Sequence, residues 1–479
     1  MRSAYGVAEV RAAERAAMAR GPEGALMQRA AAALAAECAR LLGRVYGSRV
    51  TLLVGSGDNG GDALYAGARL ARRGAGVTAV LLAPDRAHPG GLAALRAAGG
   101  RVVDGTDERD GRAEDAVAGA RLVVDGIVGI GGRGGLRERA AHLVAAARTA
   151  TVVAVDLPSG VDADTGEVHG EAVRADVTVT FGTYKPGLLV DPGREYTGAV
   201  RLVDIGLGLP RERRALEALQ YADVARLLPV PTGESDKYRR GAVGVVAGSA
   251  RYPGAAVLCV AGALHGGAGA VRYAGPAADA VVARFPEALV SAGPPSKAGR
   301  VQAWAVGPGL GDDEDRLLDV LDADVPVLID ADGLRLADER RVRARRAPTL
   351  LTPHAGEAAA LLGVDRARVE SARLAAVREL AARYGATVLL KGSTTLVADA
   401  EGPVRVNPTG TAWLATAGSG DVLSGLAGSL LAAGLEARDA GSVAAYLHGL
   451  AARHAADGAP VAAQDVAEAV PAAWRDVCG

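Results

Sequence analysis

A glycine-rich turn that ends in an aspartate, within residues 416–425, has the clearest capacity for chemistry in this chain. The stretch reads Thr-Ala-Gly-Ser-Gly-Asp-Val-Leu-Ser-Gly. Gly418 and Gly420 can present bare backbone N–H groups at the start of a helix, where unpaired donors and the helix dipole favour an anion. The carboxylate of Asp421 is suited to accept the proton of a hydroxyl that attacks phosphorus. The alternative is a plain helix start in which Asp421 only serves the first turn.

Other segments in the second half of the chain supply complementary groups. Lys391 is one of four lysines in a chain that otherwise uses arginine, and its compact cation can reach a phosphate. Thr394 and Thr395 can donate hydrogen bonds to the same phosphate. His354 can hydrogen-bond a sugar or an amide, and Glu357 could help to hold Mg²⁺ beside a polyphosphate. The alternatives are a structural histidine and a surface lysine.

The first half carries a second glycine-rich turn, which reads Gly55-Ser-Gly-Asp-Asn-Gly-Gly-Asp62. Four glycines in so short a turn suit a backbone that approaches a diphosphate closely. Asn59, Asp125 and Ser159 are oxygen-bearing residues at three predicted strand ends, and they could surround a hard monovalent cation. Asp156 could act as an acid or a base on a ligand above the same edge. For each aspartate the alternative is a helix cap or a loop hydrogen bond.

Short β-branched apolar runs alternate with helical segments in both halves, which predicts buried parallel strands whose carboxyl ends gather these residues. Residues 7–43 predict two helices broken near Gly21 and Pro22. The strands predicted in the first half are Val50–Gly55, Val77–Ala83, Leu122–Gly129, Val152–Leu157, Val177–Gly182 and Val200–Gly206. Those predicted in the second half are Val243–Ala247, Ala303–Gly307, Val325–Ala331, Thr349–Thr352 and Thr387–Lys391, with a hairpin of Thr395–Ala398 and Val404–Val406. The pattern predicts two doubly wound α/β/α domains.

A charged cluster at Arg211–Arg214 and prolines at 229 and 231 interrupt the alternation. We therefore expect a first domain at residues 1–210, a linker at 211–232 and a second domain at 233–479. The formal net charge of −1 argues against a nucleic-acid or membrane surface. Three scattered cysteines, and no apolar run like that of a signal peptide or a membrane span, indicate a cytoplasmic protein without disulfides.

Nearly all of residues 7–206 resemble the NAD(P)H-hydrate epimerase family, which has a Rossmann-like fold. The matching motifs are Gly57-Asp58-Asn59-Gly60-Gly61-Asp62, where Asp58 replaces the usual Asn, Asp125 with the 129–135 loop, and Asp156-Leu-Pro-Ser159-Gly. The resemblance implies interconversion of R and S hydrates, with potassium bound by Asn59, Asp125 and Ser159. The implied hydrate contacts are Asp58, Asn59, Gly60, Gly61, Asp62, Gly129, Ile130, Gly131, Gly132, Arg133, Gly134, Gly135 and Asp156, the last also catalytic. The fold family also includes binding modules without catalytic activity.

Residues 225–479 resemble the ribokinase-like, ADP-dependent NAD(P)H-hydrate dehydratases. The most specific match is Asn407-Pro-Thr-Gly-Thr-Ala-Trp-Leu-Ala-Thr-Ala-Gly-Ser-Gly-Asp421. The resemblance implies that Ala255, Gly309, His354 and Asp421 contact the hydrate. It implies nucleotide contacts from Lys391, Gly392, Ser393, Thr394, Thr395 and Gly420. Arg335 stands where the family usually has Asn.

Together the two resemblances imply a repair enzyme for the water-damaged nicotinamide cofactors NADH and NADPH. The second domain transfers phosphate from ADP, with Mg²⁺, to the hydroxyl of the S hydrate, and elimination of phosphate restores the dihydropyridine. The first domain supplies the S form from the R form. The resemblance also implies a homo-oligomer built on the dehydratase domain. The alternative is a ribokinase-like kinase for a small pyrimidine or thiazole alcohol, fused to a non-catalytic nucleotide-binding module.

Overall fold

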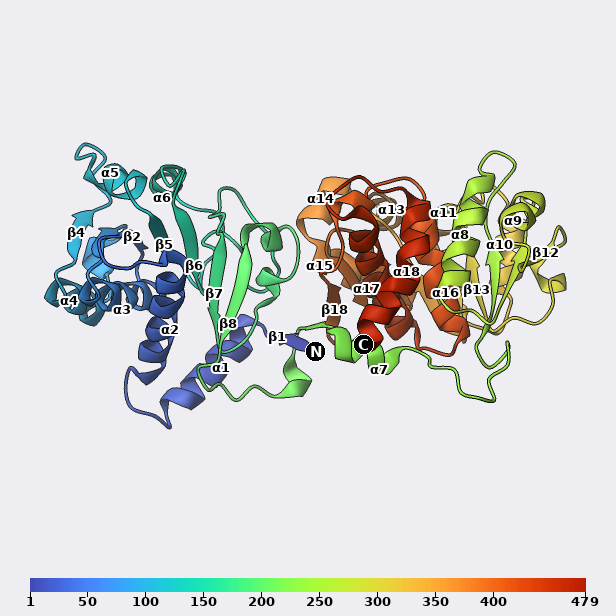
Figure 1. Ribbon diagram of the computed structural model, residues 1–479, viewed down its shortest axis with the longest axis horizontal. Helices are drawn as coiled ribbons and strands as arrows, with labels where there is room; N and C mark the ends of the chain where they lie inside the picture. Colours follow the sequence, from blue (N-terminus) through green and yellow to red (C-terminus); the bar gives the residue numbers. More distant parts are fainter. The chain divides into compact units, whose positions relative to one another are not determined.

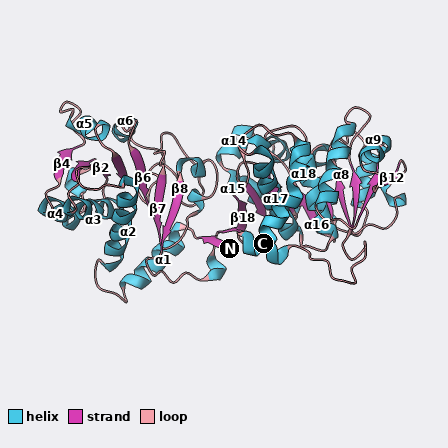
Figure 2. Cartoon of the chain, in the orientation of Figure 1, coloured by secondary structure: helices cyan, strands magenta, loops and turns pink.

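The computed structural model describes all 479 residues, which form two compact units. The N-terminal unit comprises Ser3–Ala215, and the C-terminal unit comprises Leu216–Gly479 together with Met1–Arg2. Each unit has a largely parallel sheet flanked by helices (Figures 1 and 2), which confirms the prediction of two α/β domains. Part of the segment expected as a linker is regular: Leu216–Ala218 form strand β9 and Tyr221–Leu227 form helix α7 of the C-terminal unit.

The N-terminal unit is built on seven parallel strands in the order β4-β3-β2-β5-β6-β7-β8. Their bounds are β2 Arg49–Val54, β3 Gly76–Leu81, β4 Arg101–Asp104, β5 Leu122–Gly126, β6 Thr151–Val155, β7 Val177–Phe181 and β8 Ala199–Val203. The chain winds outward in one direction from β2 to β4 and in the other from β5 to β8. The winding direction therefore reverses between β2 and β5, where a doubly wound sheet opens a crevice for ligands.

Helices cover both faces of this sheet. Their bounds are α1 Val7–Met18, α2 Ala25–Leu42, α3 Asp58–Arg72, α4 Pro89–Ala97, α5 Arg112–Ala118 and α6 Glu138–Ala145. Apolar side chains of α2, α3 and α4 form the core on one face, and those of α5 and α6 form a smaller core on the other. The predicted break between the first two helices is present, because α1 ends at Met18 and α2 begins at Ala25.

The C-terminal unit contains an eleven-stranded sheet in the order β1-β9-β18-β17-β16-β15-β14-β13-β10-β11-β12. The bounds not yet given are β1 Arg2–Ala4, β10 Ala242–Val246, β11 Ala270–Ala274, β12 Leu289–Ser291, β13 Ala303–Val306, β14 Val327–Ile329, β15 Thr349–Leu351, β16 Thr387–Leu390, β17 Thr395–Ala398 and β18 Val404–Asn407. The strands from β12 to β16 are parallel, whereas β17 is antiparallel to both neighbours, as the predicted hairpin requires. The winding direction reverses between β10 and β13.

Helices of the C-terminal unit also lie on both sides of the sheet (Figure 2). Their bounds are α8 Pro253–His265, α9 Ala278–Arg284, α10 Glu314–Leu321, α11 Asp332–Leu336, α12 Glu339–Ala344, α13 Ala355–Leu362, α14 Arg366–Ser371, α15 Arg373–Tyr384, α16 Ser419–Ala432, α17 Ala437–Ala456 and α18 Ala463–Cys478. Buried side chains of α8, α16, α17 and α18 form one continuous core. No helix in either unit combines the length and the apolar character needed to cross a membrane.

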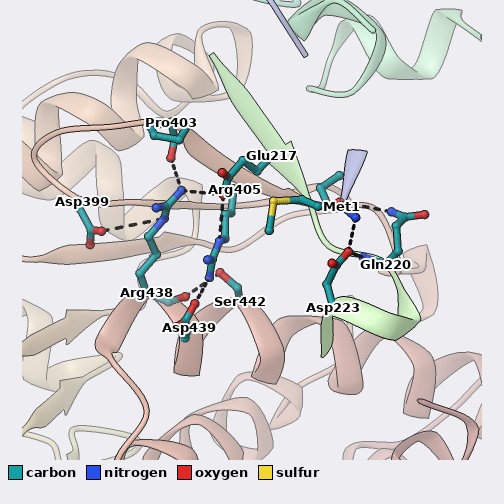
Figure 3. A network of polar contacts seen from close by, with 11 residues as sticks. Met1, Glu217, Gln220, Asp223, Asp399, Pro403, Arg405, Arg438, Asp439 and Ser442 are labelled. Atoms are coloured by element: carbon teal, nitrogen blue, oxygen red, sulfur yellow. Dashed lines mark hydrogen bonds and ion pairs between the residues drawn. The ribbon is translucent and has the colours of Figure 1, made fainter. Parts of the chain in front are cut away.

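An ionic network lies beside β9 in the C-terminal unit (Figure 3). The buried carboxylate of Glu217 accepts hydrogen bonds from Arg405 Nε at 3.4 Å and from Arg438 Nη2 at 3.2 Å. In the same region the Met1 amino group lies 2.5 Å from Asp223 Oδ2. Removing one partner of a buried ion pair leaves an uncompensated charge and destabilises the fold. The network therefore stabilises the position of β9 and of the residue that precedes β1.

Candidate active sites

The polar residues of the N-terminal unit meet where the winding direction reverses. Asp125 in β5 is opposite Leu53 of β2 on one side and Ala154 of β6 on the other. The turn after β2, the end of β5 and the start of the loop after β6 therefore share one edge of the sheet. The turn after β2 and the loops after β5 and β6 line a cavity of about 1370 Å³, large enough for a dinucleotide ligand, whereas Asp125 and Ser159 are buried and do not line it.

The three residues expected to bind a cation lie close together. Ser159 Oγ donates to Asp125 Oδ1 at 2.7 Å, and the Ser159 N–H donates to Asp125 Oδ2 at 2.8 Å. A Cβ atom at Gly129 would lie only 3.0 Å from Asn59 Oδ1, so the glycine leaves room for the amide oxygen. Burial raises the pKa of the Asp125 carboxyl to about 6. One carboxylate with amide and hydroxyl oxygens is a donor set that suits a hard monovalent cation.

Asp156 is held in place by a buried lysine. Its carboxylate accepts hydrogen bonds from Thr180 Oγ1 at 3.0 Å and the Phe181 N–H at 3.1 Å, and it pairs with Lys185 Nζ. Lys185 is 1% exposed, and its ammonium also donates to the Phe181 carbonyl. The backbone at Asp156 is left-handed, with φ of 65°, a conformation that costs energy in a residue with a side chain. Backbone strain and a buried ion pair thus coincide at a residue that lines the cavity.

Further carboxyl groups line the cavity near Asp156. Asp62 Oδ1 is buried without a hydrogen-bond partner, and burial raises the pKa of Asp62 well above its usual value, with smaller contributions from neighbouring carboxylates. Glu14 of α1 also lines the cavity, and burial followed by the charge of Asp156 raises its pKa. Carboxyl groups whose pKa is raised by burial in a cavity are candidates for proton donors to a ligand.

The remaining hydrate contacts expected in this unit divide into two groups. Asp58, at the exposed start of α3, and the whole 129–135 loop, including Arg133, line the cavity. Gly60 and Gly61 are buried and do not line it. A Cβ atom at Gly60 would lie 2.7 Å from the Gly55 carbonyl oxygen, so this glycine lets α3 begin directly against the turn.

In the C-terminal unit, the ends of β14, β15 and β16 bring Asp330, His354 and Lys391 to one edge of the sheet. Lys391 Nζ lies 2.6 Å from Asp330 Oδ1 and 3.7 Å from Glu357 Oε2. Burial alone would lower the pKa of Lys391, but the charges of Asp330 and Glu357 raise it. The ammonium group is therefore a fixed cation at this edge.

Asp421 lies in the first turn of α16, next to this cation. Gly418, which precedes the helix, has a left-handed φ of 87°. A Cβ atom at Gly420 would lie 3.5 Å from Lys391 Nζ, so the backbone of the turn approaches the ammonium group closely. Burial, and then the charge of Asp330, raises the pKa of Asp421 to about 7. A carboxyl with this pKa can accept and release a proton near neutral pH.

The loop expected to bind the nucleotide is braced by an arginine that the sequence did not single out. Arg373 of α15 is buried and donates to the carbonyls of Lys391 at 3.0 Å and Thr394 at 3.3 Å. Gly392 and Ser393 are exposed at the tip, whereas Thr394 and Thr395 are buried. The Thr395 hydroxyl donates to the Gly392 carbonyl at 3.2 Å. The loop is thus a rigid turn with an exposed backbone tip.

The other hydrate contacts expected in this unit lie near two helix starts. A Cβ atom at Gly309, which has φ of 60°, would lie 2.7 Å from the Ala255 methyl group, so these residues are adjacent. His354 caps α13: its Nδ1 accepts the Gly356 N–H at 3.0 Å and the Glu357 N–H at 3.2 Å. With Nδ1 engaged as an acceptor, the neutral ring carries its proton on Nε2, and His354 is an exposed donor.

Arg335, the departure from the family pattern, is a surface residue that steadies a turn. It donates to the Gly311 carbonyl at 3.0 Å and to Asp312 Oδ1 at 2.6 Å. Asp332 accepts the Gly311 N–H at 2.8 Å from the other side. The three hydrogen bonds together hold the turn that follows β13.

Sequence reasoning left three buried residues out of the site: Lys185, Asp330 and Arg373. Lys185 had one signal, because lysine is scarce in the chain. Asp330 also had one signal, because it lies at the end of a predicted strand, as several of the predicted site residues do. Nothing near Arg373 in the sequence indicates which loop it contacts.

Comparisons with known proteins cover both units. Residues 243–472 match the family described as NAD(P)H-hydrate dehydratase, and residues 23–187 match the family described as YjeF-related protein N-terminus. The "Bifunctional NAD(P)H-hydrate repair enzyme Nnr" of Mycobacterium leprae (strain TN) is 51% identical over 473 residues, 96% of each chain. The protein of that name from Mycobacterium tuberculosis (strain CDC 1551 / Oshkosh) is 52% identical over 452 residues, 92% of this chain and 91% of the relative. The crystal structure of the ADP/ATP-dependent NAD(P)H-hydrate dehydratase from Bacillus subtilis, co-crystallized with ATP/Mg²⁺, matches with 30% identity and a TM-score of 0.50, over 54% of this chain and 97% of that one.

Proposed function

Because the chain belongs to the family of bifunctional NAD(P)H-hydrate repair enzymes, we propose that each of its α/β units carries one of the two reactions. The enzyme interconverts the R and S hydrates of NAD(P)H and dehydrates the S hydrate at the expense of ADP. We assign epimerisation to residues 1–210 and dehydration to residues 233–479. The single observation that carries the second assignment is Asp421, a carboxyl with a pKa of about 7 beside the Lys391–Asp330 pair.

Dehydration begins with phosphoryl transfer to the hydroxyl of the S hydrate. Asp421 accepts the hydroxyl proton as the oxygen attacks the terminal phosphorus of ADP, and AMP leaves. Lys391 and the N–H groups at the start of α16 stabilise negative charge on the transferring group. Ala255, Gly309 and His354 hold the hydrate, while Gly392, Ser393, Thr394, Thr395 and Gly420 complete the nucleotide site with Lys391.

Elimination follows from the chemistry of the phosphorylated ring. The ring nitrogen donates its electron pair as the carbon–oxygen bond to phosphate breaks. A proton then leaves the neighbouring ring carbon, which restores the double bond of the dihydropyridine. Hydroxide is a poor leaving group and phosphate a good one, so the first step makes the second possible.

Epimerisation takes place in the cavity of the N-terminal unit, at the carbon that bears the hydroxyl. The hydrate lies against Asp58, Asn59, Asp62 and the 129–135 loop. Asp156, held by Lys185, acts as the acid or base for the change of configuration. Support comes from its place in the lining of the cavity and from its left-handed backbone.

Two metal ions fit the residues present. Asn59, Asp125 and Ser159 would hold potassium. The Ser159 hydroxyl donates a hydrogen bond to Asp125, and the Asn59 amide oxygen lies beside the 129–135 loop. No group of three or more His, Cys, Asp or Glu side chains forms a metal cluster, and the proposed potassium site needs only one such residue. Glu357 would help to hold Mg²⁺, which when bound supplies charge that screens the polyphosphate.

The test uses the purified protein with each hydrate separately. With ADP and the S hydrate, the dihydronicotinamide absorbance should return, and with the R hydrate it should return more slowly because epimerisation must come first. Omitting ADP should stop recovery but leave exchange between R and S detectable by chromatography. Consumption of neither hydrate would overturn the proposal, and a stable phosphorylated product would instead identify a small-alcohol kinase.

We also propose a cytoplasmic homo-oligomer built on the dehydratase domain. All three cysteines are free, which suits a reducing compartment. β12, at the open edge of the C-terminal sheet, carries the exposed apolar residues Leu289 and Val290, which a partner copy could cover. Light scattering on the intact chain measures the state, and a monomer would contradict this proposal alone.

A further inference from the structure

Asp330 is the most deeply buried carboxylate in the dehydratase site, yet none of the functions assigned above uses it. It is 1% exposed and directly follows β14. A buried charge is costly unless it is paired and hydrogen-bonded, so the contacts of Asp330 should be specific. Both of its oxygens are engaged, each by a different part of the site.

One carboxylate oxygen of Asp330 contacts Lys391, and the other contacts helix α16. Asp330 Oδ1 accepts a hydrogen bond from Lys391 Nζ at 2.6 Å, and Oδ2 accepts one from the Ser424 hydroxyl at 2.6 Å. Ser424 is fully buried in α16, one turn after Asp421. The carboxylate is therefore the direct link between the residue that would bind phosphate and the helix that carries the proton acceptor.

The backbone around Asp330 is fixed tightly enough for this purpose. Its N–H donates to the Val306 carbonyl at 3.0 Å, and its own carbonyl accepts the Gly333 N–H at 3.0 Å. A Cβ atom at Gly307 would lie 1.9 Å from the Asp330 carbonyl oxygen, so only glycine permits this approach. Ala331 follows with a left-handed φ of 49°. Strain in a residue next to a buried charge is typical of functional sites.

We propose that Asp330 is a positioning residue for phosphoryl transfer, which holds Lys391 and, through Ser424, the first turn of α16 in one geometry around the reacting atoms. This inference rests on the dehydratase function proposed above. Its distinctive consequence is that removal of Asp330 disturbs nucleotide binding and the proton acceptor together, although Lys391 and Asp421 are both still present.

The charge of Asp330 also acts on Asp421. The charged or titratable groups that influence Asp421 are Asp330, Lys391, Asp332, Glu357 and the Cys259 thiol of α8. After burial, Asp330 is the largest cause of the raised pKa of Asp421. Without this negative charge the pKa of Asp421 falls, so the acid limb of the kcat–pH profile should move to lower pH. A purely structural defect would lower the rate without moving that limb.

The test compares Asp330→Asn with the wild-type chain and with Asp338→Asn as a matched control. Asp338 caps α12, Asn is also a good cap, and the residue contacts nothing in the site. In Asp330→Asn we expect kcat/KM for dehydration to fall by about 10- to 100-fold, as for other residues that orient catalytic groups. KM for ADP should rise and the acid limb should shift down. Epimerisation, assigned to the other unit, should be unchanged, and the fluorescence of the three tryptophans, which all lie in the C-terminal unit, reports whether the mutated unit is folded.

The outcomes separate the two proposals. Failure of the wild-type chain to dehydrate the S hydrate would remove the dehydratase function itself. Normal wild-type activity, with an Asp330→Asn variant that keeps its rate, or loses rate without a change in KM for ADP or in the acid limb, would overturn the positioning role. If Asp330→Asn does not fold, Ser424→Ala removes the link between Asp330 and α16, together with a hydrogen bond of 3.1 Å to the Gly420 carbonyl in the same helix, and an unchanged kcat in that variant would overturn the role equally.

Discussion

Replacing Asp421 by Asn tests the proposed site in two ways. The substitution should abolish dehydration without affecting epimerisation, and it should raise the free energy of unfolding of the C-terminal unit. The amide keeps the shape of the side chain but cannot accept the hydroxyl proton. We expect dehydration to be abolished, while R and S hydrates still interconvert. In the wild-type chain, the dehydration rate should fall as pH drops below about 7, where the carboxylate becomes protonated.

The stability effect follows from the pKa of Asp421. A value of about 7, against a usual value of 3.8, means that the fold disfavours the ionised carboxylate by about 4 kcal/mol. Between these two values the folded chain binds the proton more tightly than the unfolded chain, so stability falls as pH rises through this window. The cost is absent below the lower value and complete above the upper one. The amide of Asp421→Asn does not ionise, so the variant lacks this cost. Its free energy of unfolding should exceed that of the wild type by up to about 4 kcal/mol near pH 8 and be nearly equal to it near pH 4.

The chain provides a selective probe for this measurement. All three tryptophans, Trp304, Trp413 and Trp474, lie in the C-terminal unit. Urea denaturation followed by tryptophan fluorescence therefore reports on the unfolding of that unit. A stability difference that does not grow with pH would refute the argument from burial. Retained dehydration in Asp421→Asn would refute the assigned proton acceptor, and equal loss of both activities would refute the division between units.

Three further substitutions test other parts of the argument. Lys185→Met leaves Asp156 without its buried cation, so epimerisation should slow by about 10- to 100-fold in a chromatographic exchange assay while dehydration of the S hydrate is unchanged. Gly309→Val forces a side chain into a site with positive φ and only 2.7 Å from the Ala255 methyl group, so KM for the S hydrate should rise strongly in the absorbance assay with epimerisation intact. Glu217→Gln removes one charged acceptor from two arginines of the network in Figure 3, while Arg405 keeps Asp439 and Arg438 keeps Asp399, so tryptophan-detected unfolding should show a loss of about 1–3 kcal/mol.

The strands that carry the sites were predictable because each is a short buried apolar run that ends in glycine or a polar residue. β1, β4, β11 and β12 were not predicted: β1 and β12 are only three residues long, and β4 has only two apolar residues. β9 and α7 fall where charged residues and prolines suggested a linker. A short edge strand has little apolar surface to bury, so its pattern is weak, and pairing with a neighbour decides its structure.

The site residues divide along similar lines. Asp421, Asp156 and Asn59 belong to glycine-rich turns, whose local conformation the sequence itself indicates. Arg373 and Asp330 act on segments 18 and 61 residues away in sequence, so only the folded chain shows which groups they hold. Gly60 and Gly61 are a different case: the resemblance implies ligand contact, and in the structure both are buried and neither lines the cavity.

The groups assembled in the C-terminal unit explain how a site built for phosphoryl transfer can serve a dehydration. In the proposed mechanism, Lys391, the start of α16 and Asp421 supply what transfer requires: a cation for the phosphate, donors for the developing charge and an acceptor for the hydroxyl proton. None of them has to push the phosphate out, because the electron pair of the ring nitrogen in the substrate does so. The same residues acting on an ordinary alcohol would release a stable phosphate ester. On this proposal the outcome of the reaction depends on which ring is bound by Ala255, Gly309 and His354, and substitutions of these residues should change the substrate without changing the transfer chemistry.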